Sequence, residues 1–131
     1  MKHSFDNEKL TINLGFVDLG HIDLLVRNGF YSNRSDLIRT AIRNQLNSHA
    51  DFTKQVTTRL TLELGLRHFT RQDLEALKAN NESLDIRVLG LATIADDVSP
   101  DLARATIASV TVLGALHASA AVKAALADRL K

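Results

Sequence analysis

The first regular pattern along the chain is a strict alternation of polar and apolar residues over positions 9–14. Leu10, Ile12 and Leu14 fall on one side of this segment, and the residues between them are polar. A period of two is typical of a β-strand with one buried and one exposed face. A single strand of this kind must pair with another strand. Because helical patterns follow it, we expect its partner to be the same segment of a second chain, in an antiparallel homodimer ribbon.

A first helix is predicted over residues 18–28. Asp18 is suited to the N-cap position, because its side chain can accept a hydrogen bond from a free backbone N–H of the first turn. Apolar residues then recur at helical spacing, and Gly29 follows the last of them. A glycine just past the last turn can adopt the left-handed conformation that closes a helix without steric cost.

A second helix is predicted to begin at Ser32, a favourable N-cap residue. Asn33 followed three residues later by Asp36 forms an alternative capping pair, so the start is defined to within one or two residues. A polar stretch over residues 47–51 is the expected hinge, unless the helix continues through Phe52. The inward face of this helix is predicted to carry residues at helical spacing: Leu37, Ile38, Ala41, Ile42, Gln45 and Leu46.

A second alternation of leucines with polar residues predicts a strand over residues 58–68. Thr70 and Asp73 then form a capping box for a helix that runs to about Asn80. Apolar triplets centred on a glycine recur 25 and 24 positions apart: Leu64-Gly65-Leu66, Leu89-Gly90-Leu91 and Leu113-Gly114-Ala115. A strand-helix unit that repeats at this spacing predicts parallel strands with helices on one face, or a short solenoid.

Two further helices are predicted near the C-terminal end, one starting at Pro100 after a Ser99 N-cap and one over the Ala-rich residues 118–130. The chain is therefore expected to be α+β. Residues 1–48 form a dimerising strand-helix-helix domain, and residues 52–131 form a small mixed α/β module in which strand-helix repeats are one interpretation.

The bulk composition narrows the class of protein. The 131 residues carry a formal net charge of +1, so any nucleic-acid binding must depend on where the charges lie. No apolar run of about eighteen residues and no export-signal block is present, and we expect a cytoplasmic protein rather than a membrane or exported one. The chain has no cysteine, which excludes disulfides and thiolate metal sites.

The sequence contains no nucleophile elbow, phosphate-binding glycine loop or Cys/His pair, so we expect neither an enzyme nor a cofactor. His49, His68 and His117 are scattered instead of lying one helical turn apart, and they have no cysteine to complete a metal site. Asp96 and Asp97 resemble part of a solvated loop more than a cation cage. No metal ligand set is therefore predicted.

Two segments together carry a resemblance: Lys-Leu-Thr-Ile-Asn-Leu at residues 9–14, and Gly-Phe-Tyr-Ser-Asn-Arg-Ser-Asp-Leu-Ile-Arg at residues 29–39. Separated in this way, they resemble the ribbon-helix-helix repressors of the Arc, MetJ and CopG type over roughly residues 8–48. The resemblance implies an intertwined homodimer that binds double-stranded operator DNA and regulates transcription, commonly as a repressor of its own operon.

The resemblance places Lys9, Thr11 and Asn13 against base edges in the major groove. Their chemistry agrees, since lysine can donate to guanine, asparagine can pair with adenine, and threonine offers a hydroxyl and a methyl group to thymine. The first turn of the second helix combines hydroxyl, amide and guanidinium groups with free backbone N–H groups, which suits a phosphate. The expected phosphate contacts are Ser32, Asn33, Arg34 and Ser35, together with Lys2 of the N-terminal arm.

The role of residues 52–131 has two readings. They form an assembly domain that joins dimers into tetramers or larger arrays, or they bind an effector or a partner protein. The apolar strands and the lack of convergent polar groups favour assembly. For the whole chain, the alternative is an antitoxin-type interaction protein that sequesters a partner through its C-terminal part and autoregulates through its N-terminal part. Antitoxin tails tend to be polar and disordered, whereas residues 58–131 are apolar enough to form a core.

We predict that Asn13→Ala weakens binding to the preferred site by about 1 to 3 kcal/mol and relaxes the base preference, because a bidentate contact to one base is lost. Arg34→Ala is expected to weaken binding to all sequences alike and to lower the salt dependence, because it removes one phosphate contact. Titrations of matched and mismatched duplexes at several salt concentrations measure both effects. Unchanged affinity in both variants would show that these roles are wrongly assigned.

Overall fold

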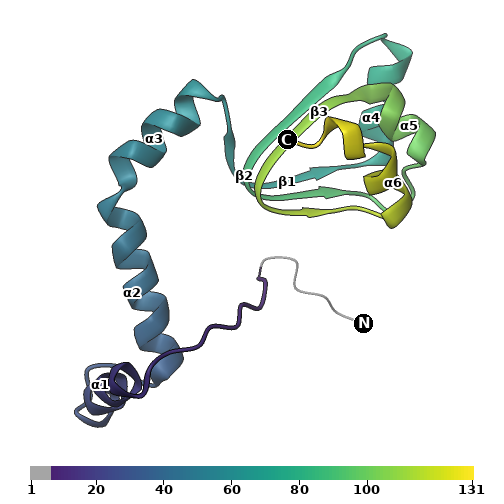
Figure 1. The fold of residues 1–131 in the computed structure, drawn as a ribbon. Coiled ribbons are helices and arrows are strands. Elements are labelled where there is room, and N and C mark those ends of the chain that lie inside the picture. The colour runs from purple at the N-terminus through teal and green to yellow at the C-terminus, as the bar shows by residue number, and fades with distance from the viewer. Residues whose placement is uncertain (1–6) are drawn as a thin grey trace. The chain divides into compact units, whose positions relative to one another are not determined.

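The computed structural model describes residues 7–131, and the chain divides into two compact units, Met1–Gln55 and Val56–Lys131. The first unit contains α1 (Phe16–Arg27), α2 (Arg34–Ser48) and the first part of α3 (Ala50–Arg59). The strands and helices of the second unit are β1 (Glu63–Phe69), α4 (Arg71–Ala79), β2 (Leu84–Ile94), α5 (Pro100–Thr106), β3 (Ile107–His117), α6 (Ala120–Ala125) and the 3-10 turn η1 (Ala127–Arg129) (Figure 1). The predicted mixture of helices and strands is confirmed.

Helix α1 begins earlier than the sequence predicts. Gly15 is its N-cap, with an extended backbone and a carbonyl that accepts a hydrogen bond from the Leu19 N–H at 3.0 Å. The assignment of Asp18 as N-cap is therefore wrong. Asp18 lies inside the first turn instead, where a carboxylate interacts favourably with the positive end of the helix dipole.

The end of α1 follows the prediction. Gly29 has a φ of +83°, in the left-handed region. Its N–H donates to the Val26 carbonyl at 3.1 Å, and the Phe30 N–H donates to the Leu25 carbonyl at 3.0 Å. These two bonds satisfy carbonyls that the end of the helix leaves free. Gly29 therefore closes the helix and turns the chain towards α2.

The N-cap of α2 is Asn33, so the prediction of Ser32 is wrong and the alternative pair is confirmed. The Asn33 Oδ1 accepts from the Asp36 N–H at 2.8 Å, and the Asp36 carboxylate accepts from the Ser32 N–H at 2.9 Å. The Asn33 backbone is extended, which directs its side-chain oxygen at the first turn. Residues 47–51 are helical except at His49, so helical structure continues through Phe52.

Residues 9–14, predicted as a strand, form neither a helix nor a strand in the single chain. A β-strand is defined by hydrogen bonds to a neighbouring strand, and the predicted neighbour belongs to a second chain. All six side chains are exposed. The intermolecular ribbon therefore stays a prediction.

The second unit is built on a three-stranded parallel sheet in the order β1-β2-β3. The strands bend together, and Figure 1 shows α4, α5 and α6 on the inner side of the bend. The prediction of parallel strands with helices on one face is confirmed. β1 starts at Glu63, later than predicted, because α3 continues to Arg59 and Thr61 then adopts a left-handed turn conformation with a φ of 52°.

Local capping signals set the helix starts of this unit. The Thr70 hydroxyl accepts from the Asp73 N–H at 3.1 Å, and the Asp73 carboxylate accepts from the Thr70 N–H at 3.0 Å, which completes the predicted capping box of α4. The hydrogen bond that the Thr70 backbone N–H donates to the carboxylate holds the pKa of Asp73 below its usual value. Ser99 caps α5, whose first residue is Pro100, as predicted.

The glycine repeat of the sequence corresponds to one row across the sheet. Gly65 pairs with Gly90, and Gly90 pairs with Gly114, in register. A Cβ atom added to Gly90 would lie 2.1 Å from the Gly65 carbonyl oxygen, and one added to Gly114 would lie 2.0 Å from the Gly90 oxygen. The backbones of neighbouring strands therefore approach closely at Gly90 and Gly114.

The core lies on the inner face of the sheet, which we define by Ile86, Val88, Ala92 and Ile94 of β2. These residues are buried in one cluster with Phe69, with residues of the three helices and with the residue that follows α6: Leu74, Leu102, Ala103, Val122 and Leu126. Burying each large aliphatic side chain contributes about 1.5 to 3 kcal/mol. The second unit therefore has a hydrophobic core of its own.

The C-terminal helix is shorter than the predicted range of 118–130. α6 ends at Ala125, and the chain then makes η1 and returns to the sheet. Leu130 forms a parallel bridge with Val110, and the Lys131 N–H donates to the Val110 carbonyl at 2.8 Å. These backbone bonds to β3 replace the helical bonds that the Ala-rich composition predicts.

Gly90→Ala is expected to destabilise the second unit strongly, by more than about 3 kcal/mol, because its Cβ would overlap a backbone carbonyl at a positive φ. Gly65→Ala is the matched control. It has a positive φ, but no atom lies within 4 Å of its added Cβ, so only backbone strain of about 1 to 3 kcal/mol is expected. Urea unfolding followed by circular dichroism measures both variants. Equal losses would contradict the close approach at Gly90.

Candidate nucleic-acid interface

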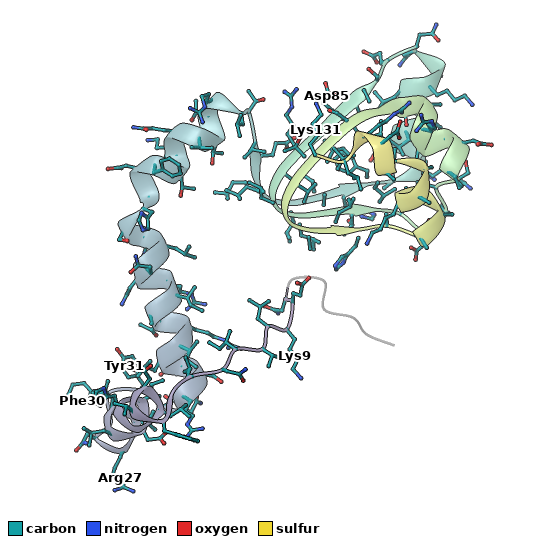
Figure 2. All side chains as sticks on the ribbon, in the orientation of Figure 1. Lys9, Arg27, Phe30, Tyr31, Asp85 and Lys131 are labelled. Atoms are coloured by element: carbon teal, nitrogen blue, oxygen red, sulfur yellow. The ribbon has the colours of Figure 1, made fainter. Side chains whose placement is uncertain are left out.

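The predicted base-reading residues lie on the segment that precedes α1. Lys9, Thr11 and Asn13 are all exposed, and Figure 2 labels Lys9 on this segment. They are spaced by two residues, so a strand conformation would place all three on one face. The single chain exposes both faces of the segment, and their position against DNA therefore depends on the ribbon.

The first unit exposes many large apolar side chains. None of residues 7–55 is buried. The Leu10 side chain is 80% exposed and that of Phe16 is 91% exposed. Further large apolar residues with exposed surfaces lie on the segment and its helices: Ile12, Leu14, Val17, Leu24, Leu25, Phe30, Ile42, Leu46 and Phe52. So many exposed apolar side chains on one unit are typical of a surface that another molecule covers.

The predicted phosphate-binding residues lie together at the start of α2. Their capping bonds occupy the Ser32 N–H and the Asn33 side-chain oxygen, both through Asp36. The N–H groups of Arg34 and Ser35 belong to the first turn, where no preceding helical carbonyl is present to accept them. These two N–H groups and the Ser35 hydroxyl lie at the positive end of the helix dipole, which suits an anion.

Arg34 forms a two-point ion pair with Asp23 of α1. Its Nε donates to one carboxylate oxygen and its terminal nitrogen donates to the other, each at 2.8 Å. The hydrogen bond from Arg34 holds the pKa of the Asp23 carboxyl below its usual value, and the same bond raises the pKa of Arg34. Both side chains are half exposed, so a phosphate can approach the guanidinium but must share it with Asp23.

The sequence does not single out Asp23 as the partner of Arg34. The two residues are 11 positions apart on different helices, and the Gly29 turn brings them together. A helix-surface rule for pairs three or four positions apart cannot detect this contact. Lys2, the remaining predicted phosphate contact, lies outside the described residues.

The second unit has a shallow polar hollow beside α4 and the start of α5. Its lining consists mainly of charged residues: Arg71, Glu75, Lys78, Asp97 and Asp101. Arg71 lies 3.9 Å from the Glu75 carboxylate and 3.8 Å from that of Asp97. Its charge is therefore shared by two neighbours, and the hollow does not concentrate one sign of charge.

Over residues 7–131, no group of three or more His, Cys, Asp or Glu side chains is placed to hold a metal ion. In the same range, no helix combines the length and the apolar character that a membrane-spanning helix requires.

Comparison with models of known protein families gives a match over most of the chain. A family model described as the Ribbon-Helix-Helix transcriptional regulator family matches residues 5–123. No curated protein and no solved structure matches the chain. The match confirms the resemblance seen over residues 8–48 and continues through the three strands of the second unit.

Arg34→Gln is expected to raise the pKa of Asp23 towards the ordinary aspartate range, because the guanidinium that stabilises the carboxylate is removed. Since this pKa is lowered by folding, the pair stabilises the fold above the unfolded pKa, and that contribution is lost as pH falls through the lowered value. NMR titration of the Asp23 carboxyl carbon measures the shift. Arg39→Gln, which removes a charge from the same helix, should leave it unchanged; equal shifts would argue against the ion pair.

Proposed function

Because the chain belongs to the Ribbon-Helix-Helix transcriptional regulator family, we propose that it is a sequence-specific repressor whose dimeric β-ribbon reads the major groove of operator DNA. The family establishes a DNA-binding regulator of transcription. The repressor role, the reading residues and the function of the second unit are the parts that we propose.

The observation that carries this proposal is the unburied first unit. None of residues 7–55 is buried, even though many of them are large apolar residues. These lie on the segment before α1 and on both following helices. A unit of this size cannot remain folded in water unless another surface covers these side chains. A second copy supplies the same alternating segment and the same two helices. One symmetric contact would therefore cover the exposed apolar side chains of both copies.

The proposed ribbon turns one face of residues 9–14 towards the helices and the other towards DNA. Leu10, Ile12 and Leu14 occupy the first face, which leaves the polar residues for the groove. Lys9, Thr11 and Asn13 then contact base edges from both chains. A two-stranded ribbon fits the major groove, and its polar side chains can distinguish base pairs there.

Ser32, Asn33, Arg34 and Ser35 are proposed to anchor the backbone of DNA, with Lys2 as a further contact. The start of α2 supports this role through its unsatisfied first-turn N–H groups. Asp36 holds the turn rigid by bonding both Ser32 and Asn33, so that the N–H groups are fixed before DNA arrives. Phosphate contacts of this kind set the register of the protein on the duplex.

The second unit is proposed to join copies of the regulator instead of sensing an effector. It has its own hydrophobic core, which supports an independently folded module. Its polar hollow contains paired opposite charges and offers no concentrated recognition chemistry for a small ligand. Joining dimers would strengthen binding to adjacent half-sites through effective concentration.

Selection of bound sequences from random duplexes, using the full-length protein, tests the proposed function. We expect enrichment of two half-sites related by two-fold symmetry, because a symmetric dimer presents the same residues twice. The Thr11→Ala/Asn13→Ala variant should lose this enrichment and keep salt-dependent binding. Enrichment of no sequence by the full-length protein, or the same sites selected by the variant, would contradict the proposed reading of DNA.

A further inference from the structure

The two edges of the sheet in the second unit differ. At the β3 edge, the Leu130 bridge and the Lys131 N–H occupy part of the backbone around Val110. At the other edge, β1 pairs with β2 on one side, and no strand among the described residues pairs with its second side. An open edge offers backbone N–H and C=O groups to another strand.

The outer face of the sheet, opposite the helices, carries two rows of apolar residues beside the glycine row. One row is Leu64, Leu89 and Leu113, and the other is Leu66, Leu91 and Ala115. None of these residues belongs to the buried cluster of the inner face. Because side chains alternate along a strand, both rows point away from that cluster.

Exposure along these rows depends on the number of neighbouring strands. Leu66 on β1 is 65% exposed, whereas Leu91 beside it on β2 is 8% exposed. Leu64 on β1 is 80% exposed, and its neighbour Leu89 is only partly exposed. The two leucines of β1 are therefore the exposed ends of rows that one further strand would extend.

We propose that the open edge of β1 pairs antiparallel with β1 of a second copy, with Gly65 on the two-fold axis. The sequence Glu63-Leu64-Gly65-Leu66-Arg67 is complementary to itself in this register. Leu64 faces Leu66 of the second copy, and Glu63 faces Arg67. Each apolar row then continues across six strands, and residues directly opposite each other are matched in hydrophobicity or opposite in charge.

The bend at Gly65 is compatible with this symmetry. Glu63 and Arg67 are four positions apart on one strand, yet their side chains approach to 3.3 Å because the strand bends between them. The two arms of β1 therefore leave Gly65 towards the same side. A two-fold axis along the bisector of the bend exchanges the arms and reverses the strand, as an isologous contact requires. No atom lies within 4 Å of a Cβ built on Gly65, so its own chain leaves the contact point open.

The charges at this edge also favour a second copy of the chain. Glu63 and Arg67 are partly exposed in their own chain, so each can interact with a further opposite charge. In the proposed register they form an alternating cluster of four charges across the axis. A like-charged or uncharged partner strand would not give this match, and opposite-charge pairs across strands are stabilising.

This inference names the contact through which the second unit would join copies, and it rests on the proposed assembly role. It does not depend on how DNA is read. Residues 9–14 and the start of α2 are in the first unit, whereas β1 is in the second. The contact and the DNA-reading ribbon can therefore be tested separately.

Directed disulfide formation tests the proposed register, because the chain contains no cysteine. Leu64→Cys and Leu66→Cys chains are co-expressed at full length and oxidised with diamide. We expect a covalent dimer on a non-reducing gel, since residues directly opposite on paired strands are within reach of a disulfide. Either chain expressed alone should link far less, because its thiols would be diagonal and about 7 to 8 Å apart.

Leu113→Cys is the matched control, since Leu113 is exposed on the same outer face but lies on β3. We expect no linked dimer from this variant. Linking of Leu113→Cys as strongly as the co-expressed pair would indicate face-to-face packing of the sheets and overturn the edge contact. No link in the co-expressed pair, with native circular dichroism, would also overturn it.

Charge complementation provides a second test. In the cysteine chains, Glu63→Arg places arginine at both positions 63 and 67, and Arg67→Glu places glutamate at both. Because position 63 faces position 67 of the second copy, like charges would repel, and each variant should lose the linked dimer. Mixed copies, one with each charge variant, should regain it, although neither chain regains its internal Glu63–Arg67 pair. If the mixed copies do not regain the link, Glu63 and Arg67 interact only within one chain, and the proposed charge pairing between copies is wrong. Operator selection with the same variants reports separately on DNA reading, which should not change.

Discussion

The apolar surface of the first unit is the constraint on which the function depends. Leucines are exposed on the segment before α1, as are aromatic residues such as Phe16 and Phe30, and none of residues 7–55 is buried. In the proposed dimer, a second chain covers this surface, and the same contact would create a two-stranded ribbon whose polar side faces outward. In this proposal, dimerisation and DNA reading are both consequences of one alternating pattern.

The second unit buries its apolar side chains within one chain. Three parallel strands bend together over a core that α4, α5 and α6 close, so its inner face is buried without a partner. The bend depends on backbones that approach at Gly90 and Gly114 too closely for any side chain. The sheet still has two edge strands, β1 and β3, each paired with β2 on one side.

Local rules predicted the elements of this chain better than their boundaries. The Thr70 capping box and the Gly29 helix end each depend on a few neighbouring residues, and the glycine repeat depends on a regular spacing along the chain. The structure contains all three. The N-caps were wrong at Asp18 and Ser32, because adjacent residues compete for a cap and small backbone differences decide between them. The Arg34–Asp23 pair could not be predicted, because it depends on how two helices pack across a turn.

The oligomeric state depends on whether the two proposed two-fold contacts join the same chains or different chains. If the ribbon and the β1 edge join the same two chains, the assembly closes as a dimer, and both surfaces are satisfied. If they join different chains, each two-fold contact adds a further copy, and the protein forms a closed tetramer or an array along DNA. The second case increases avidity for adjacent operators, because binding of one dimer raises the local concentration of the next. The geometry of the link between the units therefore determines whether this regulator occupies one site or spreads over several.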